Sequence, residues 1–367
     1  MTSLSRLSRI PRLMAVFLLA ANAQAEEEKV LNVYSWPDYI SEETIKTFKE
    51  RTGIQVNYDV YGSNEMLEAK LLAGNSGYDV VMPSAFFFER QIKIGLFQKL
   101  DRASLSGLES LDTGIMARLA RIDPNNEYGV PYMWGTTGVG YNAAMVAAVL
   151  PDAPVDSWDM LFDPEVVARL SECGVTLLDA PSEVFAVALA YLGKDPNSED
   201  MDDLKAAEEM LAKVRPHVRY IQSQQYYTDL ANGEICVAMS WSGDVMLANE
   251  RAAEAGNGVE LSYSIPREGA IMWMDVMTIP SDAPHPVNAH RFIDYMLEPE
   301  VIAGSTAHNW FANANTAAIE FIDEKIADNP SVYPSEEVKA RLFSVQLHPA
   351  RYTRAQTRAW TRFKTGR

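Results

Sequence analysis

The chain has 367 residues, of which 47% are hydrophobic, and its 32 basic and 50 acidic residues give a net charge of −18. This length suggests two lobes rather than one small domain, and the apolar content is ample for a packed core. A negative field of this size repels nucleic acid and attracts cations, so we expect no nucleic-acid partner.

The first 25 residues read as an export signal rather than as part of the fold. They contain three arginines, an apolar run at 13–20 that is too short to span a bilayer, and a small-residue cleavage pattern at 23–25. No cysteine stands directly after the apolar run, so we do not expect a lipid anchor. We therefore predict cleavage of residues 1–25 and export of a soluble chain.

The two cysteines, Cys173 and Cys236, suit an exported protein. A pair of cysteines in an oxidising compartment most simply forms one disulfide. Two buried free thiols are the alternative.

Short apolar stretches alternate with helical patterns along most of the chain. This alternation predicts βαβ units and an α/β fold with a mostly parallel sheet. The expected strands are 31–34, 56–61, 79–82, 175–178, 235–239 and 271–275, and the expected helices include 63–73, 89–96, one that begins at Ser41 and one that begins at Ser182.

Tryptophan and aspartate recur together at strand ends. Ligands of open α/β sheets bind at the carboxyl ends of strands, and aromatic faces attract cations. No lysine or arginine stands beside these acids in the sequence, and an unpaired buried carboxylate is costly, so the pattern predicts an organic cation as ligand. Alternatively, each Trp belongs to the core and each Asp shapes a turn. The pairs are Trp36 with Asp38, Trp241 with Asp244, and Trp273 with Asp275.

Further candidates lie on the same kind of loop. Tyr39 follows Asp38, Ser84 and Phe86 follow the 79–82 strand, and Phe311 follows a helical pattern. Glu183 stands in a predicted first helical turn, where complementing the helix dipole is the alternative role. Ser84 as a helix cap and Phe86 as a core residue are the alternatives for those two positions.

The segment 128–142 contains Gly138-Val139-Gly140 and formally fits the dinucleotide pattern G-x-G-x-x-A. We reject that interpretation because no buried strand of a cytosolic βαβ unit precedes it. A Gly- and Thr-rich extended segment instead predicts a crossing between two lobes.

With these residues in place, the chain resembles the periplasmic polyamine-binding proteins of putrescine/spermidine ABC importers. The similarity covers nearly the whole mature chain and includes the stretches VYSWPDYI, DVVMPSAF, GVPYMWGTTGVGYN, LDAPSEVF, DLANGEICVAMSWSGDV and FANAN. It implies a two-lobed type II periplasmic binding protein with a ligand cleft between the lobes. The expected lobes are 26–136 with 259–312, and 137–258 with 313–367.

The resemblance also assigns the site. It places Asp38 and Asp275 around one terminal ammonium and Asp244, with Glu183 close by, around the other, while aromatic rings enclose the methylene chain. It implies a monomer in the periplasm, an inner-membrane ABC permease as partner, and neither a cofactor nor a metal. The expected ligand-binding residues are Trp36, Asp38, Tyr39, Ser84, Phe86, Glu183, Trp241, Asp244, Trp273, Asp275 and Phe311.

Four positions depart from the putrescine-type pattern: Pro37 and Phe86 replace serines, Trp273 replaces Phe, and Phe311 replaces Tyr. All four changes make the cleft less polar, and the larger indole lengthens one wall. We therefore expect a preference for spermidine over putrescine.

Two other functions compete with solute delivery. The first is a carboxylate-based hydrolase, but no G-x-S-x-G or H-E-x-x-H motif is present and the five histidines are scattered. The second is a sensor subunit that binds the same ligand and docks on a receptor, which the sequence does not separate from a transport protein.

Overall fold

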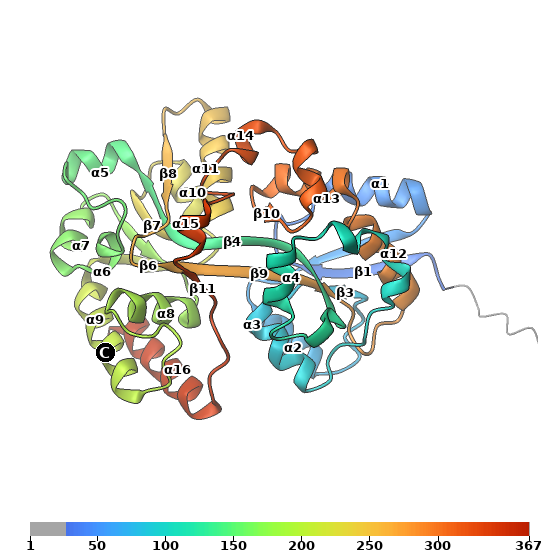
Figure 1. The fold of residues 1–367 in the computed structure, drawn as a ribbon. Helices are drawn as coiled ribbons and strands as arrows, with labels where there is room; N and C mark the ends of the chain where they lie inside the picture. Colours follow the sequence, from blue (N-terminus) through green and yellow to red (C-terminus); the bar gives the residue numbers. More distant parts are fainter. Residues whose placement is uncertain (1–26, 367) are drawn as a thin grey trace, which may run out of the picture.

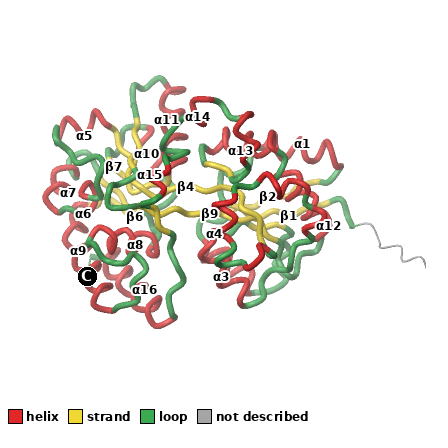
Figure 2. The backbone as a smooth tube through the Cα atoms, viewed as in Figure 1, coloured by secondary structure: helices red, strands yellow, loops and turns green. Residues whose placement is uncertain are grey.

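A computed structural model describes residues 27–366, which form two α/β lobes on either side of two long strands (Figure 1). These strands are β4 (Gly129–Asn142) and β9 (Ala270–Thr278), and they pair antiparallel across the middle of the molecule. The sheet has the order β2-β1-β3-β9-β4-β7-β5-β6. Figure 2 shows helices packed around the strands of each lobe. The predicted two-lobed α/β fold is confirmed.

The first lobe is built on β1, which pairs in parallel with both β2 and β3. Helix α1 begins where the Ser41 side chain accepts a hydrogen bond from the Thr44 N–H, and Ser63 caps α2 in the same way. The elements of this lobe are β1 (Val30–Ser35), α1 (Glu42–Thr52), β2 (Gln55–Val60), α2 (Asn64–Leu72), β3 (Val80–Val81), α3 (Ala85–Lys93), α4 (Thr113–Leu119), α12 (Pro286–Met296) and α13 (Pro299–Asn309).

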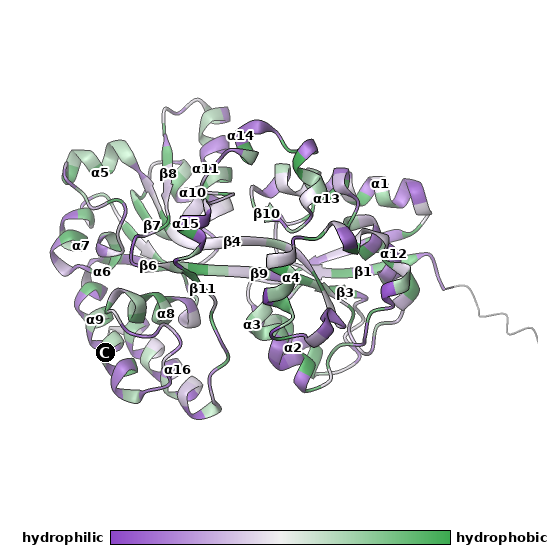
Figure 3. Cartoon of the chain, in the orientation of Figure 1, coloured by the Kyte–Doolittle hydropathy of each residue, from purple (hydrophilic) through white to green (hydrophobic). Residues whose placement is uncertain are grey.

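The second lobe repeats this plan around β5, which pairs in parallel with β6 and β7. Its helix α8 is coloured largely hydrophobic in Figure 3, and residues 183–189 of this helix are all buried. The elements are α5 (Ala143–Val149), α6 (Asp159–Phe162), α7 (Pro164–Leu170), β5 (Val175–Leu177), α8 (Pro181–Tyr191), α9 (Met201–Val214), β6 (Val218–Ile221), α10 (Tyr226–Ala231), β7 (Val237–Trp241), α11 (Ser242–Ala255), β8 (Leu261–Ser264) and α16 (Ala350–Thr365).

A third connection runs from β10 (Ala312–Asn313), which pairs with β4, through α14 (Glu324–Ala327) and α15 (Glu336–Lys339) to β11 (Leu342–Phe343), which pairs with β9. Strand β8 pairs with residues 139–142 of β4, beside the part that pairs with β7, so it lies with the second lobe although we expected 259–312 in the first. The remaining lobe boundaries stay a prediction.

Gly138 and Gly140 lie inside the long strand β4, which runs through the middle of the molecule. The helix expected at 89–96 is instead α3, Ala85–Lys93, because Ser84 already occupies its N-cap position and Gly95 adopts a positive φ of 76° just after its end.

The predicted disulfide is confirmed. Cys173, in the turn after α7, is bonded to Cys236, just before β7, with their Cα atoms 5.5 Å apart. The bond closes 63 residues of sequence and therefore restricts the unfolded second lobe.

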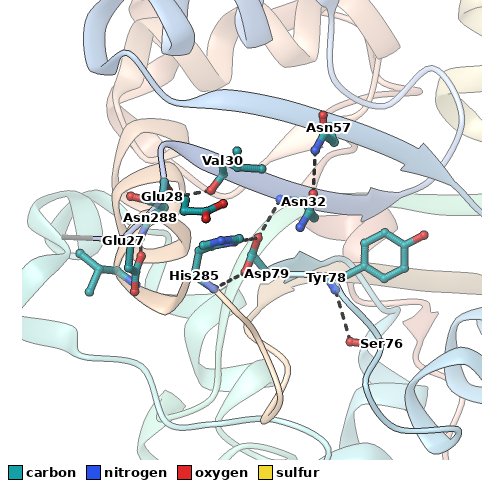
Figure 4. Close-up of polar contacts among 11 residues, drawn as sticks. Glu27, Glu28, Val30, Asn32, Asn57, Ser76, Tyr78, Asp79, His285 and Asn288 are labelled. Carbon is teal, nitrogen blue, oxygen red and sulfur yellow. Dashed lines mark hydrogen bonds and ion pairs between the residues drawn. The ribbon is translucent and has the colours of Figure 1, made fainter. Parts of the chain in front are cut away.

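A polar cluster at the far edge of the first lobe fixes the start of the described chain (Figure 4). Buried Asp79 accepts hydrogen bonds from the N–H of Asn32 at 2.8 Å and of His285 at 2.6 Å, which ties β1 to the turn before α12. Glu27 accepts from two N–H groups at the start of α12, each at 3.0 Å.

The predicted signal peptide, 1–25, lies outside the described residues. Within 27–366, no helix has the length and apolarity needed to cross a membrane.

Candidate ligand site between the lobes

One cavity of about 140 Å³ between the lobes brings together every ligand-binding residue predicted from the sequence. Its lining combines four carboxylates with six aromatic side chains and one serine from both lobes. These are Trp36, Asp38, Tyr39, Ser84, Phe86, Glu183, Trp241, Asp244, Trp273, Asp275 and Phe311.

The loop between β1 and α1 supplies the first-lobe rim of this cavity. The indole N–H of Trp36 donates to the Met82 carbonyl at 3.0 Å, and the ring packs against Tyr61 with centroids 4.6 Å apart. Asp38 adopts a left-handed backbone with φ 53°, which Asp tolerates better than most residues. This conformation places an exposed carboxylate at the rim, beside an anchored indole.

Asp38 has a cationic neighbour that the sequence did not reveal. The guanidinium of Arg251, from α11, lies 3.4 Å from Asp38 Oδ2. The expectation that none of these acids has a basic partner was therefore wrong for Asp38, because its partner lies 213 residues away in sequence. Both side chains are about half exposed, so the pair is a weak one.

Asp275 on β9 is the most perturbed carboxyl in the cavity. It is 5% exposed, and its Oδ2 accepts a 2.8 Å hydrogen bond from the Tyr39 hydroxyl. Its Oδ1 has no hydrogen-bond partner within residues 27–366. Burial raises the pKa of Asp275 to about 7, and the neighbouring hydroxyls of Ser84 and Tyr39 offset part of that effect. A buried acceptor without a donor favours a ligand that brings one.

Asp244, in the first turn of α11, has a similar environment in the second lobe. Its Oδ2 accepts a 2.6 Å hydrogen bond from the Tyr226 hydroxyl. Burial raises its pKa to about 6, while the Tyr226 bond and the charge of Arg251 lower it. A cation that enters the cavity would stabilise the charged form of this carboxyl.

Glu183 lies at the start of α8 with its carboxylate already bonded. Its Oε2 accepts from Thr137 Oγ1 at 2.6 Å and from the indole N–H of Trp241 at 3.1 Å. Burial raises the pKa of Glu183, and these two hydrogen bonds oppose that shift. Glu183 is thus more than a helix-dipole residue, because its carboxylate is held inside the cavity.

The four acids come from both lobes. The Tyr39 hydroxyl of the β1–α1 loop donates to Asp275, and the indole of Trp241, three residues before Asp244, donates to Glu183. The cavity therefore offers carboxylates on both of its sides, as a ligand with more than one positive charge requires. The expected placement of Asp38 and Asp275 around one ammonium stays a prediction.

Aromatic rings form walls of the same cavity. The rings of Trp273 and Phe311 meet edge to face with centroids 4.8 Å apart. A Cβ added at Gly243 would lie 2.6 Å from Phe311, so the glycine lets α11 approach this ring closely. Methylene groups between such rings are removed from water at roughly 0.8 kcal/mol each.

A model of the bacterial extracellular solute-binding protein family matches residues 43–334. The chain belongs to the bacterial extracellular solute-binding proteins. Membership in this family confirms the expectation of a binding protein rather than an enzyme.

Individual relatives match over nearly their full length. The putrescine-binding periplasmic protein of Escherichia coli is 48% identical, with 96% of each chain covered, and that of Pseudomonas aeruginosa is 49% identical, with 95% of each covered. A solved spermidine/putrescine ABC transporter substrate-binding protein from Streptococcus pneumoniae is 27% identical and superimposes with a TM-score of 0.77, covering 92% of this chain and 99% of that one.

Sequence reasoning missed part of the lining of this solute-binding protein. Asn64 donates to Ser84 Oγ at 3.0 Å and accepts from the Ser84 N–H at 2.9 Å, so it fixes that serine. Ser223, Gln224 and Tyr227 reach the cavity from the segment around the start of α10. They stand in a polar run that resembles an ordinary surface loop, and no pattern marks them. Within 27–366, no three His, Cys, Asp or Glu side chains are grouped closely enough to hold a metal ion.

Proposed function

We propose that this solute-binding protein captures a polyamine of the putrescine or spermidine type in the periplasm and delivers it to an inner-membrane ABC permease. The observation that carries the proposal is one cavity whose lining combines four carboxylates from both lobes with aromatic walls, the carboxylates being those of Asp38, Glu183, Asp244 and Asp275. The names of the relatives support the ligand class, the compartment and the transport role.

A protonated diamine complements this cavity. Each ammonium carries only donors, and the free Oδ1 of Asp275 is an acceptor that needs one. The rings of Trp273 and Phe311 attract positive charge and cover the methylene groups. We propose that the protein acts as a monomer, with export directed by the signal in residues 1–25.

Ligand preference within the class is a separate question. The larger indole at Trp273 led us to expect spermidine, whereas the two relatives at 48% and 49% identity are named for putrescine. Calorimetry with putrescine, cadaverine, spermidine and agmatine ranks the four directly. Tightest binding of spermidine would confirm the role of Trp273, and tightest binding of putrescine would refute it.

The function itself is tested by thermal unfolding with each amine. A ligand present at 100 times its dissociation constant adds roughly 2.7 kcal/mol of apparent stability. Asp275→Asn and Asp244→Asn should each reduce this gain sharply, whereas Asp112→Asn, at the cap of α4 and outside the cavity lining, should leave it intact. Equal gains in all variants would remove these acids from the site, and no gain with any amine would refute polyamine capture.

A further inference from the structure

A second cavity, of about 400 Å³, adjoins the ligand site and has a different chemistry. Its lining comes from α3, from the end of α4 and the residues just after it, from β9 and from residues 344–347. Phe86, Glu183 and Trp273 line both cavities. The second cavity therefore adjoins the first one at these three residues.

Three basic side chains, Lys93, Arg118 and Arg121, line this second cavity together with two acids, Glu89 and Glu183. Lys93 is paired with Glu89 at 2.6 Å, so these two charges offset each other. Arg118 and Arg121 also line the cavity, and neither guanidinium has an ion-pair or hydrogen-bond partner within residues 27–366. A guanidinium matches a carboxylate with two parallel hydrogen bonds.

The shared wall carries an unused donor. The indole Nε1–H of Trp273 is buried without an acceptor within residues 27–366. An ammonium offers only donors, so an unmodified polyamine leaves this N–H unpaired, which is unfavourable. A carbonyl oxygen on the ligand would pair with it.

We propose that the site also accepts a polyamine acylated on one nitrogen by a chain that ends in a carboxylate. The inference rests on the proposed function, because the free ammonium occupies the first cavity among its carboxylates. The acyl carbonyl accepts the Trp273 N–H in the shared wall, and the terminal carboxylate reaches Arg118 and Arg121. Binding alone is involved, with no chemical change to the ligand.

The same charges disfavour a longer unmodified polyamine in the second cavity. An additional ammonium extended past Trp273 would approach Arg118 and Arg121, and like charges repel. Unmodified amines are therefore confined to the first cavity, whereas an anionic tail is attracted to the second.

Calorimetry with three probes tests the proposal: putrescine, N-acetylputrescine, and putrescine carrying a glutaryl group on one nitrogen. The last two share the amide and differ in the terminal carboxylate. We expect the glutaryl compound to bind about tenfold more tightly than the acetyl compound. The double variant Arg118→Ala/Arg121→Ala should bind the glutaryl and acetyl compounds with equal affinity. It should still bind putrescine as tightly as the unmodified protein does, and this unchanged affinity shows that the variant is folded.

A matched control removes two positive charges elsewhere. Arg354 and Arg358 are exposed on α16 and lie outside both cavities. Arg354→Ala/Arg358→Ala should retain the full preference for the glutaryl compound. Equal affinities of the glutaryl and acetyl compounds for the unmodified protein, or equal losses in both double variants, would overturn the inference. A failure of putrescine and spermidine to bind would instead refute the proposed function.

Discussion

Arg251 and Asp38 form an ion pair across the rim of the ligand cavity, joining α11 of the second lobe to the β1–α1 loop of the first at 3.4 Å. The same guanidinium lies 5.3 Å from the centre of the Tyr227 ring and lowers the pKa of Asp244. Arg251 thus occupies the position of a cation between two acids that we assign to the ligand. It competes with the incoming ammonium for their charge.

Arg251→Ala should therefore tighten polyamine binding by roughly two- to fivefold. The lost ion pair is exposed and contributes at most about 1 kcal/mol to holding the lobes together, whereas both acids become free to attract the ligand. Calorimetry at low salt measures the change, and Arg251→Lys, which keeps the charge, is the control. Weaker binding of the Ala variant would show that the main role of the ion pair is to hold the two lobes together.

Polyamine binding should weaken as the pH falls from 8 to 5. The pKa of Asp275 is raised to about 7 and that of Asp244 to about 6, so both carboxyls take up protons in this range when no ligand is bound. An ammonium favours the charged forms, and binding near pH 6 must therefore release protons. Calorimetry in buffers of different ionisation enthalpy counts them. Asp275→Asn should lower the count, and a count that stays near zero in the unmodified protein would contradict the assigned pKa shifts.

The buried carboxyl of Asp275 should make the ligand-free protein less stable as the pH rises. Asp275 has a raised pKa in the folded state and a value near 3.9 when unfolded, so between about pH 4 and 7 the folded chain holds more protons. Its contribution to the free energy of unfolding then falls as the pH rises through this window, by a few kcal/mol. Denaturant unfolding at pH 5 and 8 should show a smaller drop for Asp275→Asn than for the unmodified chain. Equal decreases in the free energy of unfolding of the two proteins would show that a group other than Asp275 causes the loss of stability.

The sequence predicted those parts of the site that depend on local chemistry. Trp36 and Asp38 lie two positions apart just after a strand, and Asp275 shares one face of a strand with Trp273, so short-range rules were enough to find them. Arg251 was missed because it stands in the middle of a helix, and its contact with Asp38 exists only through the packing of the two lobes.

The effect of Asp38 on Asp244 needed the three-dimensional arrangement for the same reason. Asp38 and Asp244 belong to different lobes, and no spacing in the sequence indicates that their charges interact. The second cavity was also out of reach, since Arg118 and Arg121 are ordinary residues at the end of a helix until β9 and residues 344–347 are placed beside them.

The indole of Trp273, which forms one wall of the ligand cavity, packs against a glycine. Gly135 on β4 lies directly against this ring, and a Cβ built at Gly135 would come within 2.6 Å of it and 3.0 Å of Ser242 Oγ. Gly135→Ala should push the indole into the ligand cavity and weaken polyamine binding about tenfold, the effect of a displaced wall. Gly304→Ala, where no atom lies within 4 Å, is the matched control and should bind normally.

A second substitution separates this mechanism from general damage to the strand. Trp273→Phe removes the ring atoms that the new methyl group would meet, so the double variant Gly135→Ala/Trp273→Phe should bind polyamine more tightly than Gly135→Ala alone. Calorimetry on the single and double variants gives the coupling directly. If the double variant binds no better than Gly135→Ala, the loss arises from the β4 backbone, and the glycine does not act through the indole.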